Sequence, residues 1–277
     1  MAEFETITYE ERDLVAYVTM NRPEVNNAFN FQMQAELRQV WTSMRGNTDV
    51  HCAVLTGAGD KAFCTGLDRS EVMPNYVATG GKKPREGLGR AGASPMMFDD
   101  PGINICPKRV GLWKPVIAAV NGMACAGALY LLGECDIIIA SENATFFDPH
   151  VTYGMVASFE SIHILQKLPL GETLRLALLG ANERMSAQRA HQVGLVSEVV
   201  PLEELAERAQ WVAEAIASAP PLAIQATLQA AWVGHEQSRR QALDMAHTFV
   251  GLGTDYSNLA EGEAMFSGHR RAEWRLR

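Results

Sequence analysis

The chain has 277 residues, of which 47% are hydrophobic and 20% charged, and its formal net charge is −8. This composition is typical of a globular protein that is large enough to bury a sizeable core. The acidic balance argues against nucleic acid as a partner, because such binding needs a basic surface that displaces counterions from phosphate.

No apolar stretch is long enough to cross a bilayer, because the run at 116–133 is interrupted by Asn121 and several glycines. The acidic N-terminal residues contain no apolar signal core, so we expect no membrane partner and a cytoplasmic location. The cysteines are odd in number, scattered and without a CxxC pair, which predicts reduced buried thiols and no metal or redox cofactor. They are Cys52, Cys64, Cys106, Cys125 and Cys135.

The first part of the chain predicts two strands and a helix. Residues 4–23 alternate in the manner of two strands around a polar break at 10–13. Asn30 is a suitable N-cap for a helix that Gly46 would end. Its apolar residues recur at a spacing of three and four: they are Met33, Leu37, Val40, Trp41 and Met44.

Short apolar runs alternate with helical patterns further along. The runs at 52–57, 114–122, 135–141 and 194–200 predict strands buried on both faces. The stretch at 123–134 between two of them predicts a helix, as does 186–193. This alternation indicates an α/β fold with a mostly parallel sheet. From 202 to 266 the pattern is helical, with breaks at 218–221 and 251–258, so we divide the chain into an α/β core at 1–200 and a helical region at 201–277.

Residues 74–107 are rich in proline and glycine and resist regular structure. A loop of this length is either a functional lid or disordered. It contains the densest positive patch, Lys82, Lys83 and Arg85, which fits either a phosphate ligand or a solvated loop tip.

Two glycine-containing segments suggest chemistry. The segments KAFCTGLD (61–68) and NGMACAGA (121–128) each follow a predicted strand, and the second leads into a helix expected to begin at about Ala126. Glycine allows a ligand to approach the backbone closely. One backbone N–H from each segment, pointing at a common position, would form an oxyanion hole. Spacing alone leaves an ordinary turn as the alternative.

Four motifs together resemble the crotonase, or enoyl-CoA hydratase/isomerase, family. They are NRPEVNNAF (21–29), KAFCTGLD (61–68), the long run at 114–146, and DYSNLAEGEAMFSGHRRAEW (255–274). The resemblance implies a crotonase-type spiral of ββα units with a C-terminal helical trimerisation region. It also implies an acyl-CoA thioester as substrate, coenzyme A being part of that substrate, and a homotrimer or a hexamer built as a dimer of trimers.

The resemblance also assigns site residues. It makes the N–H groups of Leu67 and Gly127 the two donors to the thioester oxygen, which would stabilise an enolate. Residues in two segments would hold coenzyme A: Val25, Asn26, Ala28, Lys61, Ala62, Cys64, Gly66 and Asp68. The family places two catalytic glutamates at the positions occupied here by Tyr130 and His150, so this chain lacks the usual glutamate pair.

His150 is therefore our candidate for the catalytic acid or base, since an imidazole titrates near neutral pH. The Pro149–His150 pair also resembles the family branch that hydrolyses carbon–carbon bonds in cyclic diketones. Tyr130 would donate its hydroxyl or shape the pocket, and Glu160 is a candidate for a replacement acid. We expect structural roles for Glu134 and Asp136. Asp68 is expected to have a structural role as well, in addition to its place in the coenzyme A segment. Asp148 would cap or bend its turn.

Three functions remain open at this point. The first is a hydratase or isomerase with a rebuilt acid–base pair, the second a hydrolase of a thioester or a β-dicarbonyl C–C bond that uses His150, and the third a non-catalytic homologue that binds CoA ligands. A pocket for a bulky or ring-bearing acyl group is suggested by apolar residues in and after the long loop. They are Met73, Tyr76, Met96, Met97, Phe98 and Trp113.

Overall fold

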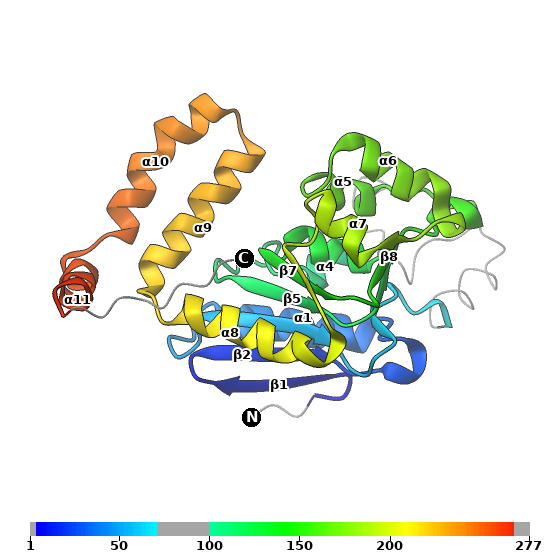
Figure 1. The fold of residues 1–277 in the computed structure, drawn as a ribbon, viewed down its shortest axis with the longest axis horizontal. Coiled ribbons are helices and arrows are strands. Elements are labelled where there is room, and N and C mark those ends of the chain that lie inside the picture. Colours follow the sequence, from blue (N-terminus) through cyan, green and yellow to red (C-terminus); the bar gives the residue numbers. More distant parts are fainter. Residues whose placement is uncertain (1–3, 71–99, 269–277) are drawn as a thin grey trace, which may run out of the picture. The chain divides into compact units, whose positions relative to one another are not determined.

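The structure is a computed structural model, and it describes residues 4–70 and 100–268 (Figure 1). Most of the loop predicted at 74–107 lies outside the described residues. The same holds for its basic patch (Lys82, Lys83 and Arg85) and for Met73, Tyr76, Met96, Met97 and Phe98.

The chain begins with an antiparallel hairpin of β1 (Ile7–Arg12) and β2 (Val15–Met20). The two strands were predicted, but the break expected at 10–13 is wrong in extent, because β1 continues through Arg12. Only Asp13 and Leu14, both with positive φ, form the turn. The charged end of β1 is compatible with a strand because β1 lies at the edge of its sheet, where polar side chains face solvent.

A six-stranded sheet is the centre of the first unit, with strand order β1-β2-β3-β5-β7-β10. From β2 onward neighbouring strands are parallel. Its remaining strands are β3 (Cys52–Gly57), β5 (Val116–Val120), β7 (Ile137–Ser141) and β10 (Glu198–Val200). All four predicted apolar runs therefore contain a strand, and β5 is buried along its whole length. The burial predicted for 194–200 is wrong, because β10 lies at the edge of the sheet and two of its three residues are only half-buried.

The predicted first helix is α1 (Phe31–Met44), and the Asn30 side chain caps it by accepting a hydrogen bond from the Met33 N–H at 2.9 Å. The five apolar residues predicted for its inner face are all buried. The cysteines are free and buried, as expected.

A second, four-stranded sheet has the order β4-β6-β8-β9. Its strands are β4 (Ala62–Cys64), β6 (Met123–Cys125), β8 (Thr145–Phe147) and β9 (Met185–Ser186). The helix predicted from 123 is wrong over its first residues, which form β6. The positive φ of Ala126 (52°) interrupts the backbone there, so α4 (Ala128–Glu134) begins only after Gly127.

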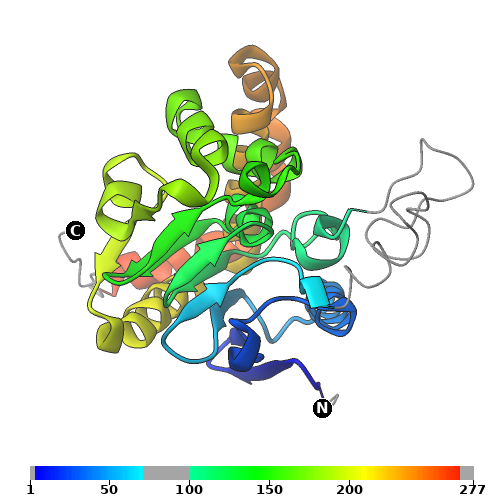
Figure 2. The ribbon, with the colours of Figure 1, turned by 90° about the vertical axis from the view of Figure 1, so that its right-hand side faces the viewer.

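Short helices cover this second sheet. Figures 1 and 2 show α5, α6 and α7 gathered on the side of β8. They are α5 (Phe159–Leu165), α6 (Leu170–Leu179) and α7 (Ala187–Gln192). A further short helix, α3 (Gly102–Ile105), packs against α1 and α4. The 3-10 helices are η1 (Pro23–Val25), η2 (His150–Tyr153), η3 (Gly180–Asn182) and η4 (Leu202–Glu204).

The chain divides into two compact units, Met1–Ala215 and Ile216–Arg277. The C-terminal helices are α8 (Leu205–Ala217), α9 (Pro221–Glu236), α10 (Arg239–Gly253) and α11 (Tyr256–Ser267). The predicted break at 218–221 separates α8 from α9. A further break, between α9 and α10, was not predicted, although Ser238 caps α10 by accepting from the Gln241 N–H.

Within the second unit, α9 and α10 pack closely where Gly253 meets Ala226. Several large apolar side chains of α9, α10 and α11 are exposed: Leu222, Leu243, Met245, Val250, Leu252, Tyr256 and Leu259. The role of 201–277 in oligomerisation stays a prediction. In the described residues, no helix is both long enough and apolar enough to span a membrane.

Candidate active site

Three neighbouring strands of the second sheet bring the main candidates to one edge. The strands β4, β6 and β8 run parallel to one another, so their carboxyl ends lie side by side. Leu67 follows β4, Gly127 follows β6 and His150 follows β8. The fold thus gathers segments that are 60 and 23 residues apart in the sequence, by subtraction of these numbers.

The two glycine bends touch each other. Gly66 has a φ of +85°, and a Cβ added there would lie 2.7 Å from the Gly127 nitrogen. A Cβ added at Gly127 would lie 2.5 Å from Phe29 Cζ. Both positions therefore require glycine, the first for its backbone conformation as well as for space.

The amides at these bends are free to bind a ligand. On either side of Leu67, the Gly66 carbonyl accepts from the Phe29 N–H (2.8 Å) and the Asp68 N–H donates to the Phe29 carbonyl (3.0 Å). Within the part of the chain that the structure describes, neither the Leu67 N–H nor the Gly127 N–H donates a hydrogen bond. An unpaired amide at a bend is what an oxyanion hole requires.

The two predicted coenzyme A segments are tied together. Arg22 forms an ion pair with Asp68 at 2.8 Å and donates to the Ala28 carbonyl at 2.7 Å. Thr65 Oγ1 donates to the Asn26 carbonyl at 3.2 Å. The structure thereby joins Val25, Asn26 and Ala28 to the segment that holds Lys61, Ala62, Cys64, Gly66 and Asp68. Asp68, buried and paired, has a structural contact.

Asn27 organises these segments and was missed by sequence reasoning. It is fully buried, and its Nδ2 donates to the carbonyls of Ala58 (3.0 Å) and Ala62 (2.8 Å). Its Oδ1 accepts from the Arg22 N–H at 3.1 Å. The available signal was the pair Asn26–Asn27, since asparagine tolerates the left-handed conformation that both adopt. Ala62 and Cys64 are buried, so only their backbone is available to a ligand.

Four side chains form a connected group that we call the acid–base cluster: Tyr130, Asp148, His150 and Glu160. His150 Nδ1 lies 2.5 Å from Asp148 Oδ1, and its Nε2 lies 3.5 Å from Glu160 Oε1. The Tyr130 hydroxyl donates a hydrogen bond to Glu160. The chain of contacts thus runs from the helix after one glycine bend, through α5, to the 3-10 helix after β8.

The position of Asp148 fixes the ring of His150. Asp148 Oδ1 also accepts from the His150 backbone N–H at 3.0 Å, so one carboxylate oxygen orients both the main chain and the ring. The side chain of His150 is 19% exposed, whereas those of Asp148 and Glu160 are 1% and 5% exposed. His150 is therefore the most accessible of the three to a substrate. Asp148 was expected to cap or bend a turn. Its contact with the His150 ring was not predicted.

The environment of the acid–base cluster shifts its proton affinities. Burial lowers the pKa of His150, but the hydrogen bond to Asp148 and the charge of Glu160 outweigh it and raise the pKa overall. Burial raises the pKa of Glu160, and the nearby His150 and the Tyr130 hydroxyl offset this only in part. Burial also raises the pKa of Tyr130 well above its usual range, so its hydroxyl stays protonated. Both His150 and Glu160 thus hold a proton more strongly than usual.

A family model described as enoyl-CoA hydratase/isomerase matches residues 10–88 and 106–277. The chain belongs to this family. The resemblance noted in the sequence and the predicted crotonase fold are both confirmed. As a member of the enoyl-CoA hydratase/isomerase family, the protein is an enzyme of the hydratase or isomerase type that acts on acyl-CoA.

Relatives match this hydratase/isomerase along nearly its whole length. The (E)-benzylidenesuccinyl-CoA hydratase of Thauera aromatica is 37% identical over 268 residues, covering 96% of this chain and 97% of its own. The 1,2-epoxyphenylacetyl-CoA isomerase of Escherichia coli is 32% identical over 276 residues and 99% of each chain. A crystal structure of an enoyl-CoA hydratase/isomerase from Mycobacterium paratuberculosis has a TM-score of 0.83 and 36% identity, with 99% of each chain covered.

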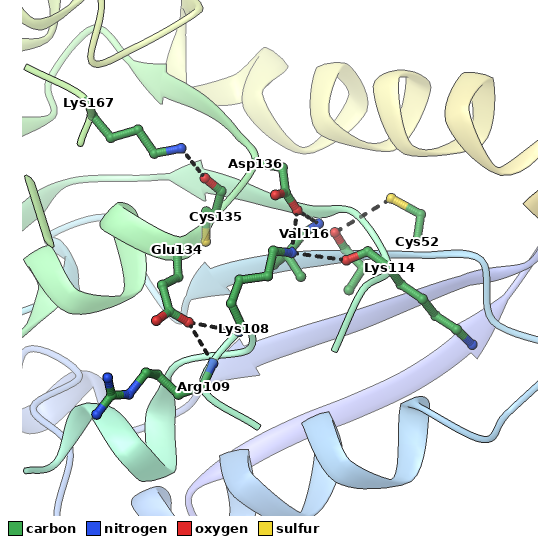
Figure 3. Close-up of polar contacts among 10 residues, drawn as sticks. Cys52, Lys108, Arg109, Lys114, Val116, Glu134, Cys135, Asp136 and Lys167 are labelled. Atoms are coloured by element: carbon green, nitrogen blue, oxygen red, sulfur yellow. Dashed lines mark hydrogen bonds and ion pairs between the residues drawn. The ribbon is translucent and has the colours of Figure 1, made fainter. Parts of the chain in front are cut away.

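A second polar group in this hydratase/isomerase, which we call the lysine cluster, consists of Lys108, Arg109, Val116, Glu134 and Asp136 (Figure 3). Glu134 Oε2 accepts from the backbone N–H groups of Lys108 (2.7 Å) and Arg109 (3.1 Å). Asp136 Oδ2 pairs with Lys108 Nζ at 2.8 Å and accepts from the Val116 N–H at 2.7 Å. Both carboxylates thus make the backbone and ion-pair contacts that the expected structural roles require.

Two sets of side chains have ligand atoms close enough for a metal ion, within 4.8 Å of one another. One is Asp148, His150 and Glu160, and the other is Cys106, Glu134 and His163. In the first set the Asp148 oxygen already contacts the ring. In the second, Glu134 is engaged by two backbone amides.

Trp113 was expected to line an acyl pocket. It is half-buried, and Lys108 Nζ lies 5.9 Å from its ring centre.

A cleft of about 370 Å³ lies elsewhere in this hydratase/isomerase, next to α6 and α7. Ion pairs line it, Arg175 with Glu183 and Arg189 with Glu172. None of the predicted site residues belongs to its lining.

Proposed function

We propose that the enzyme adds water reversibly across the α,β-double bond of an enoyl-CoA, using His150 and Glu160 in place of the usual glutamate pair. The observation that carries this proposal is the continuous acid–base cluster. Tyr130 lies in the first turn of α4, and its backbone N–H donates to the Gly127 carbonyl at 3.2 Å, which ties the cluster to the residue that carries one of the two free amides.

The thioester carbonyl is proposed to lie between the Leu67 and Gly127 N–H groups. Attack of water at the β-carbon shifts the double-bond electrons toward this oxygen and produces an enolate. Amides that are already in place stabilise this charge without reorganisation. One such donor lowers the activation free energy by about 3–4 kcal/mol. The contact between Gly66 and Gly127 supports this assignment, because it holds the two bends adjacent.

Proton transfer is assigned to the ring and one carboxyl group. His150 Nε2 takes a proton from water as the oxygen bonds to the β-carbon. Protonated Glu160 gives its proton to the α-carbon, which converts the enolate to the saturated thioester. The proton on Nε2 then passes to Glu160 across their 3.5 Å separation, and the starting state is restored. The raised pKa of Glu160 supports its role as the acid, because it keeps the carboxyl group protonated over a wider pH range.

Asp148 and Tyr130 are proposed to support this pair. Asp148 holds the proton of His150 on Nδ1, so that the Nε2 lone pair faces the water. Tyr130 donates to Glu160 and orients its carboxyl group. Neither side chain needs to contact the reacting carbon atoms.

The acyl group is proposed to carry an aromatic ring. The names of two relatives, a benzylidenesuccinyl-CoA hydratase and an epoxyphenylacetyl-CoA isomerase, both denote ring-bearing acyl groups.

We propose further that the enzyme works without a metal ion, because Asp148 and Glu160 are engaged by the histidine. Full activity after dialysis against EDTA supports this, whereas recovery of lost activity on adding Zn²⁺ contradicts it.

Homotrimers or dimers of trimers are also proposed, since apolar side chains of α9, α10 and α11 are exposed. Light scattering after size-exclusion chromatography measures the mass directly. A monomer at micromolar concentration contradicts this assembly.

The Asp148–His150 pair would also suit a hydrolase, because it would activate water against a carbonyl carbon as well. The products separate the two reactions. Hydration adds one water to the intact thioester, whereas thioester hydrolysis releases a free thiol and cleavage of a β-dicarbonyl C–C bond produces a new carboxylate. A protein that only binds CoA ligands would be stabilised by them without turnover.

The test is to incubate the enzyme with crotonyl-CoA and cinnamoyl-CoA and follow the thioesters by mass spectrometry. We expect hydrated product, a fall in kcat of about 10³-fold in His150→Ala, and a fall of similar order in Glu160→Gln. The matched control is His191→Ala, an exposed histidine of α7 that we expect to leave kcat unchanged. Unchanged turnover in His150→Ala would contradict the proposal.

A further inference from the structure

Arg69 is a cation near the acid–base cluster, close enough for its charge to act on His150. Arg69 follows Leu67 by two residues and is exposed, and its Cζ lies 5.0 Å from the ring centre of Tyr153. Tyr153 belongs to the same short 3-10 helix as His150 and is 56% exposed. The guanidinium group is therefore held next to the proposed site by a ring that is itself largely exposed.

Among the described residues Arg69 has no carboxylate partner, whereas nearby Arg22 is paired with Asp68 at 2.8 Å. The carboxylates closest to His150, on Asp148 and Glu160, contact that histidine. The charge of Arg69 reaches His150 and opposes its protonation. Arg69 thus does not support the imidazolium, and its charge is available to an anion that arrives with the substrate.

We propose that Arg69 binds a carboxylate at the far end of the acyl chain, so that the enzyme prefers thioesters of dicarboxylic acids. The position of the acyl chain rests on the proposed function, in which the Leu67 N–H holds the thioester oxygen and His150 faces the β-carbon. A carboxylate placed beyond that carbon comes within reach of Arg69. The fork of the guanidinium group suits a carboxylate, and its stacking on Tyr153 orders the side chain before binding.

The anion has two possible sources, the acyl chain and the phosphates of coenzyme A. Succinyl-CoA and butyryl-CoA separate them, because both carry the same phosphates and only the first carries an acyl carboxylate. Both thioesters are saturated, so neither is hydrated and their dissociation constants do not depend on turnover.

The test measures both dissociation constants by calorimetry for the wild type, Arg69→Gln and Arg69→Lys. We expect the wild type to bind succinyl-CoA about tenfold more tightly than butyryl-CoA. Arg69→Gln should remove this preference by weakening succinyl-CoA alone, and Arg69→Lys should keep part of it. The matched control is Arg12→Gln, since Arg12 also stacks on a tyrosine, Tyr17, at 4.0 Å but lies in the first hairpin.

Equal weakening of both thioesters in Arg69→Gln would assign the residue to the coenzyme phosphates and overturn the proposal, as would a wild type without a preference. A kinetic arm compares hydration of glutaconyl-CoA with that of crotonyl-CoA. If neither is hydrated while the succinyl-CoA preference depends on Arg69, the proposed reaction fails and this inference stands. If both are hydrated with equal kcat/KM in wild type and variant, the inference fails and the reaction stands.

Discussion

The acid–base cluster and the lysine cluster are built from similar residues near opposite ends of α4, Tyr130 close to its start and Glu134 at its end. In the lysine cluster the carboxylates are occupied by backbone N–H groups and by Lys108 Nζ. In the acid–base cluster they contact a histidine that is partly exposed. The comparison teaches that burial of a carboxylate does not indicate function, whereas contact with a titratable and reachable partner does.

The largest expected effect is on stability, from Lys108→Met in the lysine cluster. The buried Asp136 carboxylate would lose the Lys108 cation that lies 2.8 Å away, and removing one partner of a buried ion pair typically costs about 3–5 kcal/mol. Urea denaturation at neutral pH measures the loss. The matched control is the double variant with Asp136→Asn, which removes the unpaired charge and should lose less. Equal losses in the two variants would show that the ion pair does not matter.

The next effect is a pH dependence of stability that Glu134 causes. Burial raises the pKa of Glu134 from its usual value of 4.5 to about 7, although hydrogen bonds from two backbone N–H groups lower it in part. A raised carboxyl pKa means that its stabilising contribution is complete below about pH 4.5 and is lost as the pH rises through about 7.

The variant Glu134→Gln keeps an acceptor oxygen but cannot ionise. We expect the free energy of unfolding of the wild type to fall relative to this variant by about 3 kcal/mol between pH 4.5 and pH 8. Parallel stability curves over this range would show that Glu134 stays ionised in the folded protein.

A smaller effect, on catalysis, is expected from Asp148→Asn. Loss of the carboxylate should lower kcat/KM by about 10²-fold, or about 2.7 kcal/mol, because the ring loses its fixed tautomer. Asp148 raises the pKa of His150, so its removal lowers that pKa. Activity that needs neutral His150 rises with pH through this pKa, so the acidic limb of the kcat/KM profile should move to lower pH. A uniform loss at every pH, without a shift, would indicate a purely structural role.

The smallest of these effects is expected from Tyr130→Phe, about tenfold in kcat, or about 1.4 kcal/mol. The Tyr130 hydroxyl lowers the pKa of Glu160, so the variant should raise it. If Glu160 acts as the acid, the basic limb of the kcat profile moves to higher pH. A shift to lower pH would contradict the assigned direction of proton transfer.

Much of the fold could be predicted because its strands are continuous apolar runs. The run at 52–57 is β3 over its whole length, and Asn30 caps α1 as its side chain suggested. The strand at Met123–Cys125 was missed because small residues show no decisive period. The strand ends because Ala126 adopts a left-handed backbone conformation, which alanine rarely does.

The candidate site could be predicted only in outline. The glycine bends could be located from the sequence because glycine after a strand indicates a position where a Cβ would clash with its neighbours. The contact between Glu160 and His150 could not be derived, since it depends on how α5 packs beside η2. The contact of Asp148 with the ring spans two residues, but it requires the turn that the 3-10 helix creates.

In the proposed mechanism, the side-by-side order of β4, β6 and β8 determines the spacing of the groups that contact the ligand. These strands present, in sequence, the first amide, the second amide and the imidazole, and adjacent strands are separated by about 4.8 Å. In the proposed site, the distance between the two amides and the His150 imidazole is thus set by the pairing of the strands and not by side-chain length. A thioester whose unsaturated carbon lies several bonds further from sulfur would overshoot the ring, however well its tail fitted.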